Sequence, residues 1–216
     1  MKPLLTCVLG TYIAVFGALT GCATGPRARP LQSGQTSCYE PNSNSIVGCV
    51  GTGQDGELQA GVARRYVDNG DGTITDVRTG LMWEKKCADG SIHDQEKEYS
   101  WIDAFAVFIV GLNRARFAGH TDWRLPNVNE LHTLVDYGQM ASPTIAPVFN
   151  RACATGCTVL TCSCTSQAYS HSYYYWSSTT ITDNPEDAFG VSFVGGYVGG
   201  HDKSDTLYVR AVRGGL

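Results

Sequence analysis

The sequence predicts a loop-rich α+β domain in which two helices accompany short antiparallel sheets. Three observations support this fold class. Glycine accounts for 25 of the 216 residues, which is typical of a chain with many turns. Residues 100–113 carry apolar side chains at helical spacing. Short β-prone runs separated by turn-forming residues lie on both sides of that segment. We therefore expect one main core, with the helices between two sets of strands.

The charge of the chain argues against some classes of partner and of activity. The formal charge is -4 and the pI about 5.7, so we expect neither nucleic acid nor an anionic membrane surface as a partner. The five histidines are dispersed and no Gly-x-Ser-x-Gly elbow occurs. The sequence accordingly predicts no enzyme and no cofactor.

The N-terminus resembles a bacterial lipoprotein signal. Lys2 precedes an uncharged apolar run over 4–19 that is shorter than the roughly 20 residues of a membrane span. The run ends in a Leu-Thr-Gly-Cys sequence that resembles the lipobox, whose cysteine, here Cys22, is lipidated after cleavage. We expect a signal peptide at 1–21 and an anchor in the bacterial outer membrane, since Ala23 is not an aspartate. Which face of that membrane the domain occupies stays open.

Two segments separate the anchor from the domain. Residues 22–37, the lipidated cysteine and a run rich in Pro, Gly and Ser, predict a flexible tether. Residues 38–63 predict a hairpin closed by a disulfide between Cys38 and Cys49, followed by a polar glycine-rich loop. Within the hairpin, a Glu-Pro-Asn tripeptide matches a calcium-ligating motif of lectins, but it precedes the core, and we interpret it as chance.

The domain itself, 64–216, begins with three predicted strands at 66–67, 73–75 and 81–83. The turn between the first two, Asp68 to Gly72, invites a calcium interpretation. Registered as an EF-hand loop, it lacks acidic residues at both ends. A hairpin turn is the better interpretation, so calcium is possible here but not supported.

Two helices are predicted next. The first spans 100–113, with Ser100 as N-cap and Asp103 at the capping-box position. The second spans 128–136 and follows a strand-to-helix corner at 121–131, where Asn127 is the expected N-cap.

Four cysteines then fall within twelve residues, at 153, 157, 162 and 164. A zinc site with four thiolates is one interpretation. Two disulfides, or one disulfide plus a link to Cys87, are others, and an exported chain favours disulfides. Local pairing of Cys157 with Cys162 would close an insertion loop, while the pairing of Cys153 and Cys164 stays open.

The C-terminal part returns to strands, predicted at 175–179, 189–193, from 197, and at 207–213. Polar loops at 182–187 and 199–206 lie between them. Loops on a rigid frame commonly form binding surfaces, so we take their side chains and nearby aromatic residues as ligand-binding candidates. These are Tyr173, Tyr174, Asp183, Asn184, Glu186, Tyr197, His201, Asp202, Lys203 and Asp205.

Four ordered motifs resemble one known family. They are Asp71–Trp83, Asp122–Asn127, Tyr175–Thr179 and Tyr208–Arg213, and together they resemble the Lcl C-terminal-domain family over roughly 64–213. The resemblance implies a C-type-lectin-like fold akin to formylglycine-generating enzymes. It also implies that Trp83, Trp123, Arg124, Trp176 and Arg210 are core or buried-pair residues. Trp101 is a further core candidate, from the helical spacing of the aromatic residues in 100–113.

The resemblance also shapes the functional hypotheses. The namesake domain belongs to an adhesin that binds sulfated polysaccharide, and some relatives of this fold carry segments diversified by retroelements. The first hypothesis is a lipid-anchored binding module for a glycan or protein. The second is a structural envelope lipoprotein that binds a partner protein. An enzyme of the formylglycine-generating type is the third, and the sequence leaves the oligomeric state unknown.

Overall fold

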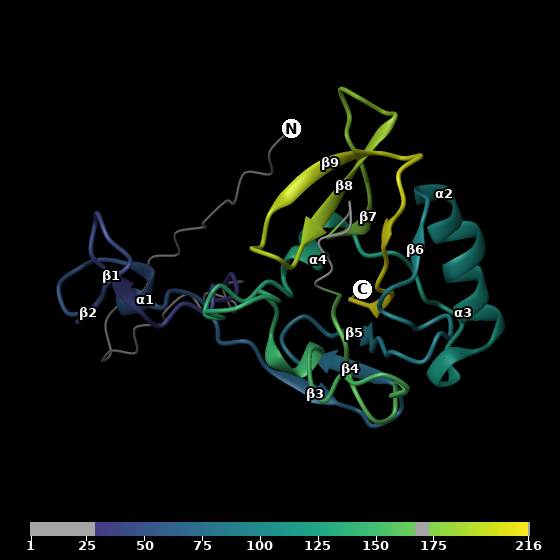
Figure 1. The fold of residues 1–216 in the computed structure, drawn as a ribbon, viewed down its shortest axis with the longest axis horizontal. Helices are drawn as coiled ribbons and strands as arrows, with labels where there is room; N and C mark the ends of the chain where they lie inside the picture. Colours follow the sequence, from purple (N-terminus) through teal and green to yellow (C-terminus); the bar gives the residue numbers. More distant parts are fainter. Residues whose placement is uncertain (1–28, 167–172, 216) are drawn as a thin grey trace, which may run out of the picture.

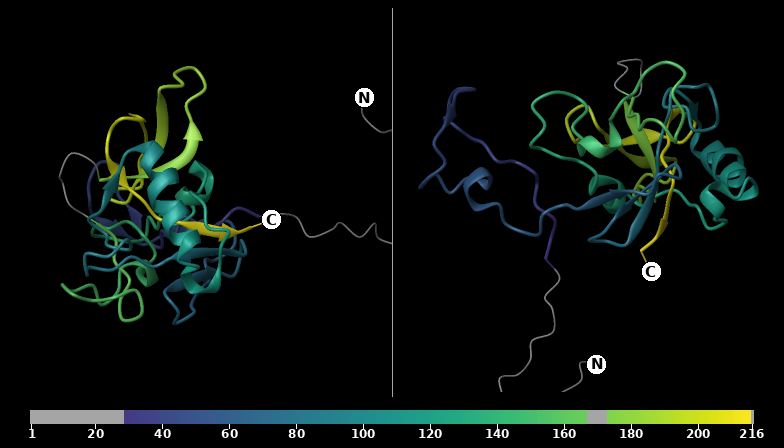
Figure 2. Two further views of the ribbon diagram at one scale, coloured as in Figure 1. Left: turned by 90° about the vertical axis from the view of Figure 1, so that its right-hand side faces the viewer. Right: turned by 90° about the horizontal axis from the view of Figure 1, so that it is seen from below.

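The protein is described by a computed structural model covering residues 29–166 and 173–215. It is a mixed structure with few helices and several sheets (Figures 1 and 2), so the predicted α+β class is confirmed. The predicted signal peptide and Cys22 lie outside the described residues. Within the described ranges, no helix has the length and apolar character needed to cross a membrane.

The segment 38–63 forms a small lobe beside the main domain (Figure 1). Strands β1 (Cys38–Tyr39) and β2 (Ile46–Val47) pair antiparallel, and the predicted disulfide between Cys38 and Cys49 closes the hairpin. The predicted polar loop is wrong in part, because it contains the short helix α1 (Asp55–Leu58). Two backbone N–H groups of the glycine-rich turn donate to the Glu57 carboxylate and order this loop.

The predicted tether is too long at its C-terminal end. Leu31 forms a parallel bridge with Val62, and the Tyr137 N–H donates to the Ser33 carbonyl over 2.9 Å. The chain from Leu31 onward therefore lies against the lobe and the domain. These contacts use backbone groups, which leave no periodic signal in the sequence.

A four-stranded sheet, ordered β11-β5-β4-β3, forms the first half of the domain. Strands β3 (Tyr66–Asp68), β4 (Thr73–Asp76) and β5 (Leu81–Glu84) form the predicted antiparallel meander. The Asp68-to-Gly72 segment is the hairpin turn between β3 and β4, as its Asn, Asp and Gly content predicts.

A five-stranded sheet forms the second half. Its strands, in spatial order, are β6 (Glu98–Tyr99), β10 (Leu207–Tyr208), β7 (Tyr174–Thr180), β8 (Asp187–Ser192) and β9 (Val198–Asp202). The predicted polar loop at 199–206 is therefore wrong in its first half, which is the edge strand β9. The Gly-Gly-His-Asp sequence has no apolar alternation to reveal this strand.

The predicted terminal strand at 207–213 is also wrong, because it is two strands in different sheets. Residues 207–208 form β10, whereas β11 (Val212–Gly214) pairs with β5 in the other sheet. Val209, Arg210 and Ala211 cross between the sheets and are fully buried. The apolar run is continuous because the whole crossing is inside the protein.

The predicted helix at 100–113 is present, but its middle is a π-helix. Its parts are α2 (Trp101–Asp103), the π-helix η1 (Ala104–Ile109) and α3 (Val110–Arg114). The Ser100 hydroxyl accepts the Asp103 N–H, as predicted for the N-cap. A 3₁₀ turn, η2 (Phe117–Gly119), follows.

The second helix is shorter than predicted. Helix α4 (Val128–His132) begins at Asn127 with both bonds of the capping box. The chain then leaves the helix, and Val135 forms a bridge with Ile145. A further 3₁₀ turn, η3 (Pro147–Phe149), leads to the cysteine-rich insertion.

Two residues predicted as structural core, Arg124 and Trp101, are only partly buried. The Arg124 side chain is 39 % exposed and forms a bidentate pair with Glu130. Trp101 is half-buried, and its indole N–H donates to the Ser177 carbonyl over 3.0 Å. Trp101 nevertheless packs against buried residues of the core, and Arg124 joins α4 to β11 through its bonds to Glu130 and to the Gly214 carbonyl.

The other four predicted core residues are buried. Trp83 lies in an apolar cluster around α4 and the four-stranded sheet. Trp123 and Trp176 lie in a second cluster, under the 101–114 helix. The Trp123 indole N–H donates to the Phe117 carbonyl over 3.0 Å, which satisfies its polar atom inside the core.

A buried polar network centred on Glu84 holds the crossing segment. One Glu84 oxygen is 2.8 Å from His93 Nδ1 and 3.3 Å from the Lys86 ammonium. The other accepts the Ala211 N–H over 3.0 Å. The Glu84 carbonyl accepts from the Arg210 guanidinium over 2.9 Å. Burial raises the pKa of Glu84, but Lys86, His93 and the Ala211 N–H together bring it below its ordinary value.

Trp123→Ala should lower the free energy of unfolding by about 3–5 kcal/mol, because it opens a cavity in a fully packed cluster. Urea denaturation measures the change. Ile102→Ala, at a residue 68 % exposed on the neighbouring helix, is the control and should change stability by less than about 0.5 kcal/mol. A loss below about 1 kcal/mol for Trp123→Ala would contradict the assignment of this tryptophan to the core.

Glu84→Gln should destabilise the protein by about 3–5 kcal/mol at neutral pH, because Lys86 would lose its buried carboxylate. The folded-state pKa of Glu84 is lowered. Its stabilisation is therefore complete above the unfolded-state pKa and is lost as the pH falls through the folded-state pKa. Unfolding curves recorded from neutral to acid pH should lose part of their pH dependence in the variant.

Asp122→Asn is the matched control, since this carboxylate pairs with Arg213 at the exposed surface. It should cost about 0–1 kcal/mol. If the two variants are equally stable, the Glu84 network does not hold the fold.

Candidate ligand-binding surface

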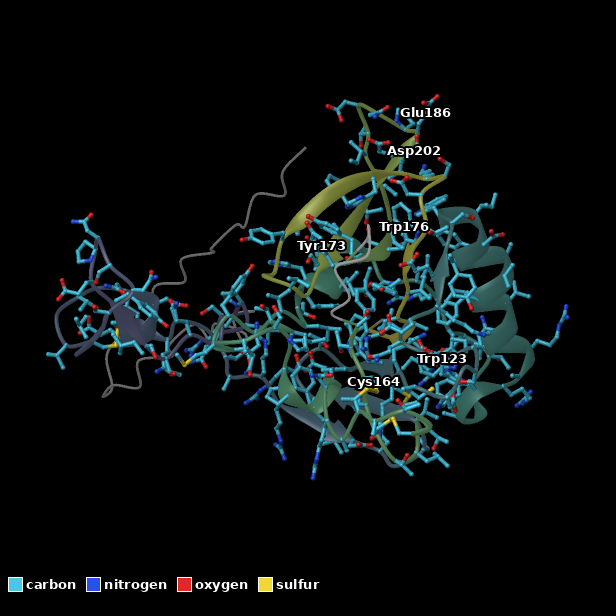
Figure 3. The ribbon with its side chains drawn as sticks, viewed as in Figure 1. Trp123, Cys164, Tyr173, Trp176, Glu186 and Asp202 are labelled. Atoms are coloured by element: carbon cyan, nitrogen blue, oxygen red, sulfur yellow. A yellow bond between two sulfur atoms is a disulfide. The ribbon has the colours of Figure 1, made fainter. Side chains whose placement is uncertain are left out.

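The ten ligand-binding candidates divide into two groups on strands β7, β8 and β9 (Figure 3). An aromatic group contains Tyr173, Tyr174, Tyr197 and His201. A polar group lies at the loop between β7 and β8 and at the turn after β9. In Figure 3, Glu186 and Asp202 mark the polar end of this hairpin, and Tyr173 marks the aromatic end.

Three rings of the aromatic group are in contact. Tyr173 and Tyr174 stack with their centroids 5.2 Å apart, and the Tyr174 ring lies 4.2 Å from the His201 ring. Tyr174 on β7 and His201 on β9 lie on the same face of the sheet, on either side of β8. Residues distant in the sequence thus form one aromatic surface, which we call the aromatic face: Tyr173, Tyr174, Tyr197 and His201.

Two glycines create the space for these rings. A Cβ atom at Gly190 would lie 3.3 Å from His201, and one at Gly199 would lie 3.2 Å from the Tyr174 ring. Both distances are tighter than ordinary van der Waals contact. Strand glycines that admit a close approach are a known device, and here they let the rings lie over the neighbouring strands.

His201 brings a polar atom to the aromatic face. Its Nε2 is buried and has no hydrogen-bond partner among residues 29–166 and 173–215. Burial lowers the pKa of His201, while Asp205 and Asp187 oppose that shift. The imidazole is therefore neutral at neutral pH, with one ring nitrogen unpaired.

Tyr197 is the exposed member of the aromatic face, with 64 % of its surface accessible. It follows the Gly195-Gly196 turn between β8 and β9. Burial raises the pKa of Tyr174, and the neighbouring phenols of Tyr173 and Tyr197 add to that effect. The Tyr174 phenol consequently stays protonated and remains a hydrogen-bond donor.

Several residues of the polar group have local structural roles. The Lys203 ammonium donates to the Pro185 carbonyl over 2.8 Å and to Thr180 over 2.9 Å. The Asn184 amide donates to Asp187 over 2.9 Å. The Asp202 carboxylate accepts the Ser204 N–H, which lowers the pKa of Asp202. These contacts hold the loop in one conformation.

All four acidic candidates are exposed: Asp183, Glu186, Asp202 and Asp205. The carboxylates of Asp183 and Glu186 have no hydrogen-bond or ion-pair partner in the described part of the chain, although the Glu186 carbonyl accepts the Lys203 N–H over 3.0 Å. The polar end of the hairpin therefore presents carboxylates on a loop that other residues fix.

Trp101 and Lys203 border a shallow depression of about 520 Å³ beside the polar group. The Lys203 ammonium lies 4.3 Å from the centroid of the Trp101 ring. The backbone N–H of Trp101 donates to the Lys203 carbonyl over 3.1 Å. Ser100, Ile102 and Ser204 complete its lining, which is mostly apolar.

A second pocket, of about 210 Å³, lies under the cysteine-rich insertion and was not predicted. Its polar residues include Asp68 and Lys85, which form an ion pair of 2.9 Å, and Arg151. The Ser163 hydroxyl also lines it and is buried, with no partner in the described ranges. The lining comes from separate chain segments, so no single motif could reveal the pocket.

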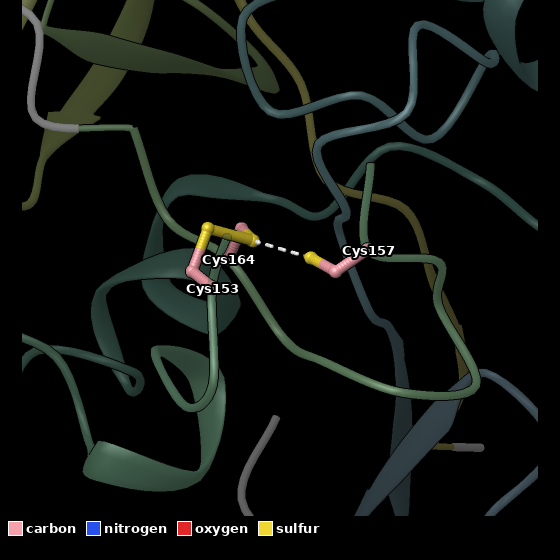
Figure 4. A group of neighbouring side chains, drawn as sticks. All are labelled: Cys153, Cys157 and Cys164. Carbon is pink, nitrogen blue, oxygen red and sulfur yellow. Dashed lines mark hydrogen bonds between the residues drawn. A yellow bond between two sulfur atoms is a disulfide. The ribbon is translucent and has the colours of Figure 1, made fainter. Parts of the chain in front are cut away.

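The insertion contains two disulfides, Cys153–Cys164 and Cys157–Cys162. Of the predicted alternatives, the structure has two disulfides within the insertion and no link to Cys87, which is a buried free thiol. Cys153, Cys157 and Cys164 are also the one group in the described structure whose sulfur atoms are close enough to hold a metal ion (Figure 4).

One comparison with known proteins identifies the family. The family model described as the Lcl C-terminal domain matches residues 72–213, a range that begins just before β4 and includes the 101–114 helix, α4, the five-stranded sheet and the aromatic face. No curated protein matches the chain. The matched range covers about two-thirds of the sequence and agrees with the extent of the motifs. The chain therefore belongs to the Lcl C-terminal domain family.

Proposed function

We propose that the protein is a lipid-anchored envelope protein whose C-terminal domain is a C-type-lectin-like module for binding a glycan. The aromatic face carries this proposal. It brings three tyrosines and a neutral histidine together at the surface of β7 and β9. Surfaces of rigid aromatic side chains with a few adaptable polar groups are typical of binding sites.

The chemistry of the aromatic face suits a sugar. The C–H face of a pyranose ring packs on tyrosine rings, which combine apolar area with a hydroxyl group. The protonated Tyr174 phenol supplies a hydrogen-bond donor for a sugar hydroxyl. The exposed carboxylates of Asp183 and Glu186 extend the surface with hydrogen-bond acceptors.

The mixed architecture supports the C-type-lectin-like fold in the proposal. Two helices accompany short sheets, and the terminal strands carry the candidate residues on loops and edges. In our proposal this frame binds a ligand without a cofactor or catalysis, and calcium is not required. Segment 182–207, which includes both polar loops, is where a diversified binder would vary.

A second candidate function is favoured by one observation. The 101–114 helix exposes Ile102, Val107 and Val110, with 68 %, 53 % and 45 % of their surfaces accessible. Contiguous apolar surface of this kind marks protein interfaces. A structural lipoprotein that binds a partner protein through this helix is therefore the alternative.

Tyr197→Ala should weaken glycan binding by about tenfold or more, as expected for an exposed aromatic anchor, and should leave stability unchanged. Binding of the purified protein to a glycan array, with and without calcium, measures the effect. Tyr39→Ala, in the separate lobe, is the control and should bind like the parent. The second function is correct if no glycan binds and one envelope protein co-purifies with the parent protein. That co-purification should be lost in the Ile102→Asp variant.

Cys22→Ser should release the protein from the membrane fraction of a Gram-negative host, because the acyl chains are then absent. Cell fractionation and labelling with a fatty acid measure this. Cys87→Ser, which removes a thiol elsewhere in the chain, is the control and should stay membrane-bound and labelled. A labelled Cys22→Ser protein would contradict the anchor.

A further inference from the structure

The sulfur atoms of the cysteine-rich insertion form one compact cluster, which we call the sulfur cluster: Cys153, Cys157, Cys162 and Cys164. The two disulfides do not lie apart. The sulfur of Cys164 is 3.7 Å from that of Cys157 and 3.8 Å from that of Cys162. The sulfurs of Cys153, Cys157 and Cys164 all lie within 4.8 Å of one another. Figure 4 shows Cys157 directed at the Cys153–Cys164 disulfide.

These separations match those of a metal site. A Zn²⁺ ion binds thiolates at about 2.3 Å in a tetrahedron, so neighbouring sulfurs lie about 3.8 Å apart. The contacts between the two disulfides already have this spacing. The sulfurs now bonded in pairs would need to separate, and Cys162, which is outside the group of three sulfurs within 4.8 Å of one another, would need to approach Cys153.

We propose that the sulfur cluster is a tetrathiolate site for a thiophilic divalent cation such as Zn²⁺ when two molecules of a dithiol, one for each disulfide, have reduced both disulfides. Each disulfide takes up two electrons and two protons, and each dithiol becomes a cyclic disulfide. The four thiols then release four protons as four metal–sulfur bonds form. The insertion thus has two closed states, one with two disulfides and one with a metal ion.

Exposure of the sulfur cluster supports its reduction, and the charge around it supports metal binding. Cys153 is exposed and Cys157 half-buried, so a dithiol can reach each disulfide, whereas Cys162 and Cys164 are buried. A divalent cation with four thiolates carries a net charge of about -2. Arg210, fully buried, donates to the Cys164 carbonyl over 2.7 Å, so a cation lies next to the site.

Cys87 lies in the same apolar neighbourhood but outside the sulfur cluster. Its thiol lies 3.0 Å from an Asp89 carboxylate oxygen and donates to it. Burial raises the pKa of Cys87 to about 11, which disfavours the thiolate. The proposed site therefore uses the four insertion cysteines alone.

Cobalt binding tests the proposal. The purified protein is reduced with dithiothreitol, freed of reductant under anaerobic conditions and titrated with Co²⁺. We expect a thiolate-to-cobalt absorption band that saturates at one ion per chain, and four thiols that cobalt protects from alkylation. The oxidised protein should show neither. Zn²⁺ should displace the cobalt and remove the band.

Three variants separate a built site from adventitious thiol binding. Cys157→Ser should weaken cobalt binding by about 100-fold or more. This loss exceeds the one expected when a residue that only hydrogen-bonds to a metal ligand is replaced. Cys157→His should restore binding with a shifted band, because imidazole is also a ligand. The double variant Cys38→Ser/Cys49→Ser is the control and should bind like the parent. Near-UV circular dichroism checks that each variant is folded.

Several results would overturn the proposal. They are a reduced, folded protein without the absorption band, protection of fewer than four thiols, and equal affinity in the Cys157→Ser variant. Loss of the band in the Cys38→Ser/Cys49→Ser control would assign the metal to the separate lobe and would also overturn it.

Discussion

The contact on which the domain most depends is that of Glu84 with the buried crossing segment. Ala211 lies between two sheets, where its N–H lacks a strand partner. The Glu84 carboxylate accepts this N–H, while the Glu84 backbone N–H donates to the Ala211 carbonyl over 3.0 Å. Because Arg210 donates to the Glu84 carbonyl, one residue of β5 fixes two of the three residues of the crossing, Arg210 and Ala211. Buried polar groups are stable in a core only when they are satisfied in this way.

Much of the local structure follows from residue patterns. Asn127 and Glu130 predict a capping box, and both of its bonds are present. Cys38 and Cys49 flank a run of turn-forming residues, and their hairpin is closed by the expected disulfide. These features depend on a few neighbouring residues, so their physical causes are readable in the sequence.

Other features depend on contacts between distant segments and could not be predicted. The strand at 207–213 is broken because Glu84, more than a hundred residues earlier, replaces a sheet partner for Ala211. Strand β9 lacks an apolar pattern, since Gly199 lies against the Tyr174 ring and Gly200 against the Ile181 side chain, where a Cβ atom would be crowded. For the candidate surface, tyrosines and His201 could be proposed from the sequence, but their contact could not. The pocket beside Ser163 was missed for the same reason.

The spacing of the cysteines has a consequence for the order of events during biosynthesis. The three disulfides join residues only 11, 11 and 5 positions apart. Loops this short close quickly and need no tertiary structure. Each pair can therefore form soon after its second cysteine reaches an oxidising compartment. Cys87 meets the insertion later, when Lys86 and Cys164 form their bridge. By then its neighbours are already paired, and the odd thiol is enclosed without competing for a partner.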